Sequence, residues 1–339
     1  MNRTHLILAI IIAILAPALL MAQDADVVYL EGFPTLRSGG ATRDLDFGLV
    51  IRPGDSVVTG RRDFAELDQA GNSIRINSDT VFTVREIERD GRRETVLTNT
   101  VGSVAFRFQT LAGRQQQVGT ATAVAGVRGT EFTVYAGSDG SSLFGVDSGL
   151  ITVESAGVGV DVAAGQAVEV RAGEAPGDVI RWIGPELDFS TWDQERVDSF
   201  LDDPITSLQR LQTRMRDFIA NGAAMYEIYL ESWAELQEAE AERGRIRDRD
   251  GAAAADAFFQ ATVAPRVRQT LIHVLNYRFY DVSALSLRRF VYSRMYISMK
   301  TRYWNDLQNP AFQEFLSSYR SMLDEFETSI AVRLDPEDI

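Results

Sequence analysis

The apolar residues of this chain change their spacing partway along the sequence. From Val27 to about Arg171 they alternate with other residues in short runs, and alternation places the apolar side chains on one face of a β-strand. From Trp182 onward they recur in steps of three and four, which is the period of an amphipathic helix. The two periods in succession predict an α+β protein of two domains, an all-β domain followed by an all-α helical bundle.

The alternating runs are short, and turn-forming residues separate them. Pairs such as Pro53-Gly54 and Asp139-Gly140 fall between the runs, and glycine supplies the positive φ angles that tight turns require. Strands at a spacing of about 8–12 residues favour a sandwich, a barrel or a solenoid of stacked coils. We therefore expect a solenoid-like or sandwich-like β domain over residues 27–172. The clearest runs are Phe47, Leu49 and Ile51; Val104, Phe106 and Phe108; and Val158, Val160 and Val162.

A linker is predicted over residues 173–189, where Pro176 and Gly177 interrupt both periods. The remainder, residues 190–334, predicts a helical bundle, because long helices joined by short links pack side by side. This half is rich in tyrosine, tryptophan and phenylalanine. Most of these rings are expected in the core, and some are expected to line a groove for a partner.

Capping residues predict where the helices begin. Ser190 or Thr191 is expected to cap a short helix. Asp203 followed by Pro204 predicts the start of a long helix that ends near Arg243, because proline is favoured in the first helical turn. Further helices are predicted over residues 252–279 with a bend at Pro265, over residues 283–307, and from Asn309-Pro310 onward.

A secretory signal peptide is predicted over residues 1–22. Arg3 precedes an apolar run from Leu6 to Ala16, and small residues follow that run. The run is too short to cross a bilayer, which takes about 20 residues. We expect cleavage after Ala22 and a periplasmic or other extracytoplasmic location. The alternative is an uncleaved segment, residues 6–21, that anchors the protein in the inner membrane.

The composition excludes several classes of function. The chain has 48 acidic and 34 basic residues, a net charge of −14, so it repels nucleic acid and we expect no nucleic-acid partner. It contains no cysteine, and His273 is the one histidine beyond the predicted signal peptide, so thiolate and histidine-rich metal sites are excluded. No nucleophile-elbow or phosphate-loop motif occurs. We expect no enzyme activity, cofactor or metal, although paired carboxylates for glycoside hydrolysis need no fixed spacing.

Two stretches carry a resemblance to a known family. The first is Arg52-Pro53-Gly54-Asp55-Ser56-Val57-Val58-Thr59-Gly60, and the second surrounds the string Val127-Arg128-Gly129-Thr130-Glu131-Phe132. With these stretches, the sequence resembles the FecR domain family over about residues 27–172. The resemblance implies an extracytoplasmic β-rich fold used for sensing or protein contact. It makes the second string, called the motif segment below, the candidate interaction site: Val127, Arg128, Gly129, Thr130, Glu131 and Phe132.

The motif segment predicts a turn between two strands. Gly129 permits a backbone conformation that is closed to other residues, and Thr130 is able to satisfy nearby backbone groups. Arg128 and Glu131 are predicted to pair across the turn. Two interpretations stay open at this point, an architectural corner without a ligand and a site for a ligand or partner.

The leading functional hypothesis is a non-enzymatic protein-interaction or sensing module in the cell envelope, with an envelope protein as its partner. In the best-known family layout, a cytoplasmic anti-sigma segment and a membrane helix precede the FecR domain. Here only the predicted signal peptide precedes it, so we do not expect the sigma-factor role to transfer. The alternatives are a glycan-binding or structural envelope protein and, more remotely, a hydrolase. Contact with the membrane is expected only through the N-terminal segment.

Overall fold

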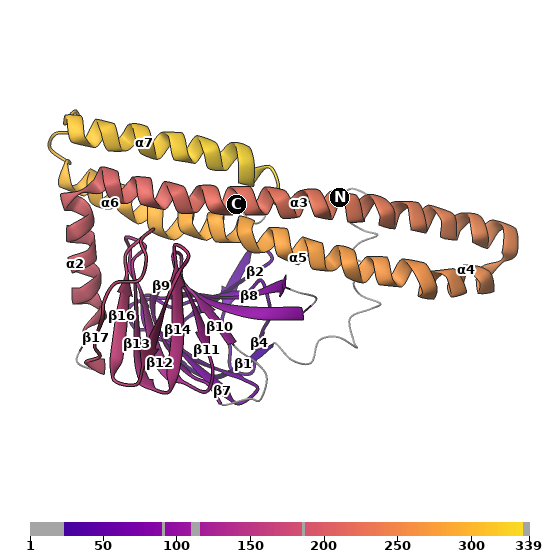
Figure 1. The fold of residues 1–339 in the computed structure, drawn as a ribbon, viewed down its shortest axis with the longest axis horizontal. Coiled ribbons are helices and arrows are strands. Elements are labelled where there is room, and N and C mark those ends of the chain that lie inside the picture. Colours follow the sequence, from indigo (N-terminus) through magenta and orange to yellow (C-terminus); the bar gives the residue numbers. More distant parts are fainter. Residues whose placement is uncertain (1–23, 90–91, 110–115, 185–186, 335–339) are drawn as a thin grey trace.

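The computed structural model describes residues 24–89, 92–109, 116–184 and 187–334 (Figure 1). The predicted signal peptide, its cleavage after Ala22 and the alternative membrane anchor over residues 6–21 lie outside the described residues. Among the helices that are described, none combines the length and the hydropathy needed to cross a membrane.

The β part follows the alternating segments of the sequence. Its chain passes repeatedly between two sheets, and most neighbouring strands are antiparallel. The strands are β1 (Ala25–Glu31), β2 (Thr35–Ser38), β3 (Ala41–Asp44), β4 (Val50–Ile51), β5 (Ser56–Val58), β6 (Phe64–Gln69), β7 (Asn72–Ile76), β8 (Val81–Arg89), β9 (Arg92–Arg107), β10 (Gln116–Gly119), β11 (Val124–Val127), β12 (Glu131–Ala136), β13 (Ser142–Ser148), β14 (Leu150–Ser155), β15 (Val158–Ala163), β16 (Gln166–Val170) and β17 (Val179–Arg181).

Strand β9 belongs to both sheets. Its first part pairs with β8 in one sheet, and its last part pairs with β7 and β12 in the other. The change occurs at Gly102, which has a φ of +103° and lies so close to Thr80 that a Cβ atom would overlap that residue. Side chains from both sheets, such as Phe106 and Leu97, meet in one buried core. The β part is therefore sandwich-like, one of the two predicted alternatives.

The range predicted as a linker contributes to the sheet. Residues 179–181 form β17, which pairs with β16 through Val168 and Val179. Trp182 then lies against Gly145, where a Cβ atom would overlap the indole ring. The indole Nε1–H donates a hydrogen bond of 2.7 Å to Asp147. These contacts tie the junction to the β part.

The C-terminal part is helical, as predicted. The elements are α2 (Phe189–Asp202), α3 (Pro204–Asp250), α4 (Ala252–Phe258), the π-helical segment η3 (Phe259–Val263), α5 (Ala264–Ser286), the π-helical segment η4 (Leu287–Tyr292), α6 (Ser293–Arg302), α7 (Pro310–Phe326) and the π-helical segment η5 (Glu327–Ala331). In Figure 1, α3 and the run from α4 to α6 form a long antiparallel hairpin over one end of the strands, and α7 lies along the other side of α3.

Two predicted helix starts are confirmed and one is wrong. Asp203 caps α3 by accepting from the backbone N–H of Thr206, and Asn309 caps α7 in the same way. Asp188, rather than Ser190 or Thr191, caps α2, because its carboxylate accepts hydrogen bonds from both of those hydroxyl groups and from the Thr191 backbone. Serine and threonine here support the cap without forming it.

Two predicted helix ends are also wrong. Helix α3 continues beyond Arg243 through the charged tract to Asp250, and Gly251 with a φ of +90° ends it. Its 47 residues make it about 70 Å long. The break predicted between residues 279 and 283 does not occur, because no glycine or proline lies between residues 266 and 309. The helical path runs unbroken from Ala252 to Arg302 and includes the π-helical segments η3 and η4. The bend predicted at Pro265 stays a prediction.

Candidate functional site

The motif segment forms a sharp corner between β11 and β12. Val127 and Phe132 are buried on either side of the corner, and Gly129 takes a φ of +61°. The Thr130 hydroxyl donates to the backbone oxygens of Arg128 at 3.2 Å and Leu150 at 3.0 Å. The predicted positive φ and the predicted backbone role of threonine are therefore confirmed.

The predicted pairing of Arg128 with Glu131 is wrong. Glu131 forms its ion pair with Arg107, at 2.8 Å, because antiparallel pairing of β12 with β9 places these two residues directly opposite each other. Arg128 is exposed. Sequence spacing suggested a local pair, whereas the strand register supplied a partner 24 residues away.

The motif segment lies at the end of the β part that faces away from the helices. Strand β12 begins at Glu131, and the turn that follows its far end contacts the helices. In that turn, Gly137 lies against Trp192, and Gly140 lies against Leu211 and Val291. Only Arg128 and the exposed Arg107–Glu131 pair give the segment a polar surface. Its core residues act as an architectural corner, and its use as an interaction site stays a prediction.

The turn between β12 and β13 is fixed to the helices by polar contacts. Asp193 on α2 accepts hydrogen bonds from the backbone N–H and the hydroxyl of Ser138, at 2.6 and 2.8 Å. Arg294 on α6 donates to the same hydroxyl at 2.7 Å. Next to it, Asp139 accepts two hydrogen bonds from Ser141. These contacts link residues far apart in the sequence and hold the two parts in one arrangement.

Burial raises the pKa of the Asp139 carboxyl, and its hydrogen bonds from Ser141 do not offset this effect. A carboxyl whose pKa is higher in the folded state holds its proton more tightly there, so it adds stability as the pH falls from neutral toward about 4. We expect Asp139→Asn to lose the stability that Asp139 adds as the pH falls. Urea unfolding of the original protein and the variant at several pH values measures this difference. Parallel pH profiles of the two proteins would contradict the role given to Asp139.

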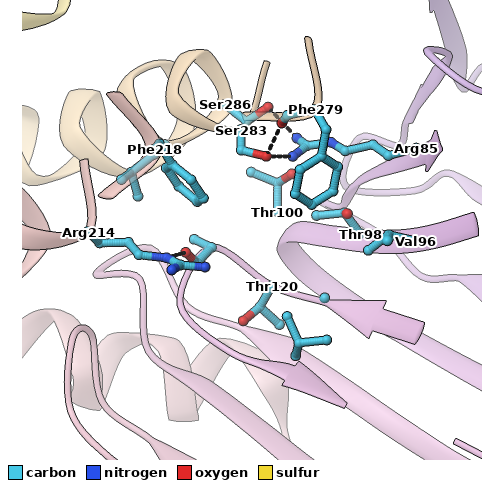
Figure 2. Close-up of a pocket in the computed structure, with 14 residues that line it drawn as sticks. Arg85, Val96, Thr98, Thr100, Thr120, Arg214, Phe218, Phe279, Ser283 and Ser286 are labelled. Carbon is cyan, nitrogen blue, oxygen red and sulfur yellow. Dashed lines mark hydrogen bonds between the residues drawn. The ribbon is translucent and has the colours of Figure 1, made fainter. Parts of the chain in front are cut away.

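A small cavity lies between the β part and the helices (Figure 2). It encloses about 30 Å³ of space, which admits about two water molecules and is far below the roughly 300–1,000 Å³ of a pocket for a drug-sized ligand. Strands β8 and β9 supply Arg85, Thr98 and Thr100, and the helices supply Arg214 and Ser283. The remaining lining residues are Val96, Gly119, Thr120, Ala121, Val124, Phe218, Phe279, Ser286 and Leu287.

Arg85 is the charged group most deeply placed at this cavity. Its side chain is 6% exposed, and its guanidinium donates hydrogen bonds to the hydroxyls of Ser283 and Ser286 on α5. Those hydroxyls in turn donate to backbone oxygens of their own helix. The Phe279 ring lies 5.9 Å from the guanidinium carbon. Burial lowers the pKa of Arg85 to about 10, because the charged form loses its water.

Arg214 on α3 lines the same cavity. Its Nε–H donates to the backbone oxygen of Ala121 at 3.3 Å, and its guanidinium lies 4.4 Å from the centre of the Phe218 ring. Burial also lowers the pKa of Arg214. In Figure 2, the side chains of Arg85 and Arg214 enter from opposite sides of the view. Sequence reasoning missed both residues, because an arginine within a strand or helix ordinarily points to solvent.

The end of the helical hairpin forms a separate structural unit, which we call the arm and define as residues 226–277. Its buried residues pack on one another, and Leu236 and Ala239 of α3 meet Val263 and Val267. The rings of three tyrosines pack between its two antiparallel helices, with centroids 5.1–5.6 Å apart. They are Tyr226 and Tyr229 on α3 and Tyr277 on α5. In Figure 1 the arm projects beyond the strands.

One face of α3 in the arm is acidic. Glu227, Glu231, Glu235 and Glu238 are exposed on α3, and their spacing of four, four and three residues places them on one helix face. Ile228 and Leu230 lie beside this face and are 40% and 41% exposed.

His273, which the sequence placed in an apolar helical stretch, lies on α5 within the arm. Its Nε2 atom is 3.0 Å from the amide nitrogen of Gln269. Within the described part of the chain, no group of three or more histidine, cysteine, aspartate or glutamate residues is placed to hold a metal ion.

Comparisons with known proteins agree with the resemblance in the β part. The model of the FecR protein family matches residues 55–152. Two crystal structures, each of a proposed anti-sigma factor from Parabacteroides distasonis, are similar to part of the chain. One is 16% identical with a TM-score of 0.32 over 37% of this chain and 58% of its own, which is less than two thirds of its length. The other is 15% identical with a TM-score of 0.32 over 46% of this chain and 73% of its own. No curated protein matches the chain.

Proposed function

Because residues 55–152 match the FecR protein family, we propose that this protein is a non-enzymatic interaction or sensing module of the cell envelope. The family match supports a role in sensing or signalling in general terms. In this proposal the β part is a rigid base, and the arm is the element that contacts a partner protein. The partner is an envelope protein with a basic and partly apolar surface.

The projecting arm is the observation that carries this proposal. Its two antiparallel helical segments bury side chains against each other, and the arm projects beyond the strands (Figure 1). A helix of 47 residues is longer than contact with the β part requires. The exposed row that includes Glu227, Glu231 and Glu238 favours a basic partner, because complementary charges speed association and exclude partners of like charge. Ile228 and Leu230 offer apolar contact beside that row.

We test the proposal by placing a photo-crosslinking amino acid at Ile228 of the full-length chain in its native host. The matched control is Ile180, which is 51% exposed on β17 of the β part. We expect one recurring protein adduct from position 228, identified by mass spectrometry, and none from position 180. Adducts from position 180 alone would contradict the arm as the contact surface, and the absence of protein adducts from either position would contradict the interaction function.

Charge reversal of the arm provides a quantitative prediction for the crosslinked partner. The triple variant Glu227→Lys, Glu231→Lys and Glu238→Lys is expected to weaken binding about tenfold or more, chiefly by slowing association at low salt. The exposed position of all three residues means that the fold is retained. Biolayer interferometry at two salt concentrations measures the effect. Unchanged binding, together with co-sedimentation of the protein with purified cell wall, would favour the glycan-binding alternative.

Export to the envelope is part of the same proposal. It rests on the signal peptide predicted over residues 1–22 of the sequence. We expect N-terminal sequencing of the protein from its host to start at Gln23. A chain recovered from the cytosol with its first residues intact would contradict this part of the proposal.

A further inference from the structure

We propose that the cavity between the β part and the helices binds a small inorganic anion, about the size of chloride or bromide, held by Arg85. This inference goes beyond the proposed function and does not depend on it. The ligand chemistry is set by the charge of the buried groups, by polar atoms that have no partner in the protein, and by the size of the cavity.

The charge at the cavity is positive, and the described contacts give Arg85 no carboxylate partner. Among the described residues, no carboxylate makes an ion pair or a hydrogen bond with Arg85, whose guanidinium bonds only to neutral hydroxyls. Arg214 bonds to a backbone oxygen and contacts a ring, and the nearby carboxylate of Asp217 acts on its charge. The chain has 48 acidic residues, yet none of them lines this cavity. A buried charge is stable only when it is paired, and an anion would supply the pairing.

Two polar atoms at the cavity also lack partners in the protein. The Nε–H of Arg85 and the hydroxyl of Thr100 are buried and make no hydrogen bond to a described group. Both residues line the cavity, and Thr100 is 2% exposed. Buried polar groups of native proteins are nearly always satisfied. The guanidinium N–H and the hydroxyl O–H are both donors, so an anion is able to satisfy them together.

The size and walls of the cavity restrict which anion fits. About 30 Å³ of space accommodates a halide more readily than a tetrahedral oxyanion. Valine, leucine and phenylalanine side chains form much of the wall, and these groups cannot replace the water lost by a strongly hydrated ion. We therefore expect bromide and chloride to bind, and fluoride, sulfate and phosphate to be excluded.

The first experiment compares thermal unfolding of the full-length protein and Arg85→Met in sodium bromide, chloride, fluoride and sulfate at equal ionic strength. Arg85→Met is expected to fold, because an apolar group in place of a buried charge is often neutral or stabilising. We expect bromide and chloride to raise the midpoint of the original protein by roughly 2–5 °C more than that of the variant. Sulfate is expected to stabilise both equally, because it acts by exclusion from the surface.

Two further variants separate the site from general salt effects. Arg107→Met removes an exposed arginine and is expected to keep the full bromide shift. Thr100→Val keeps the charge and removes the hydroxyl, so it is expected to weaken bromide binding about tenfold. Equal bromide shifts in the original protein and in Arg85→Met would overturn the proposal.

The second experiment does not depend on any variant. Crystals of the original protein are soaked in bromide, and the ion is located by its anomalous scattering. We expect a peak within hydrogen-bond distance of Arg85 Nε and Thr100 Oγ1. Peaks confined to the protein surface would overturn the proposal, and a peak in the cavity from phosphate soaks instead would overturn the selection by size.

Discussion

Replacing Asp281 with alanine is expected to lower the free energy of unfolding by about 3–5 kcal/mol. Asp281 on α5 is fully buried and accepts two hydrogen bonds from the guanidinium of Arg333, at 2.7 and 2.9 Å. Gly222 of α3 lies so close to it that a Cβ atom there would overlap the carboxylate. The variant leaves Arg333 charged in a site where its side chain is 10% exposed. Urea unfolding measures the loss.

A second variant distinguishes a missing counter-ion from a simple cavity. Combining Asp281→Ala with Arg333→Met removes both charges, so it is expected to recover part of the stability lost in the single variant. As a control, Glu325→Ala breaks the more exposed pair with Arg216 and is expected to cost at most about 1 kcal/mol. Similar losses in the free energy of unfolding for Glu325→Ala and Asp281→Ala would show that burial does not make the Asp281–Arg333 pair more important than an exposed pair.

Replacing Phe132 with alanine is the second prediction with a large effect, a loss of about 3–5 kcal/mol. Phe132 is fully buried in the core of the β part. Its ring stacks on Phe106 with centroids 5.1 Å apart, and Phe108 lies 5.9 Å away. Removing the ring leaves a cavity in a core that closes only partly. Urea unfolding again provides the measurement.

Arg128→Ala is the matched control within the same motif segment. Arg128 is exposed, and Glu131 has Arg107 rather than Arg128 as its ion-pair partner. Its replacement is expected to change stability by no more than about 0.5 kcal/mol. A loss from Arg128→Ala as large as that from Phe132→Ala would contradict the architectural interpretation. A loss of partner crosslinking with unchanged stability would instead make the segment an interaction site.

The roles of the motif segment show how far local sequence reaches. The turn at Gly129 and the apolar residues beside it were predictable, because backbone conformation and side-chain alternation depend on near neighbours. The partner of Glu131 was not predictable. It depends on the register between β9 and β12, which are separated in sequence by the strands β10 and β11.

In the helical part, too, local features were predictable from the sequence and long-range features were not. Asp203 and Asn309 were predictable as caps, because a cap bonds to residues two or three positions away. The sequence analysis predicted a break between two helices near Tyr280. The structure is helical there, and no glycine or proline interrupts the sequence at that point. Tertiary contacts of α5 with α3 and with β8 support that helix.

The sequence by itself determined the order of β and helical parts, the match to the FecR family over residues 55–152 and the main turns and caps. These features arise from the period of apolar residues and from bonds between near neighbours. Only the tertiary structure decided that β17 joins the sheet, that the arm projects, and that Arg85 and Arg214 line one cavity. Such features depend on which surfaces meet after folding, and burial, rather than residue type, gives the two arginines their unusual environment.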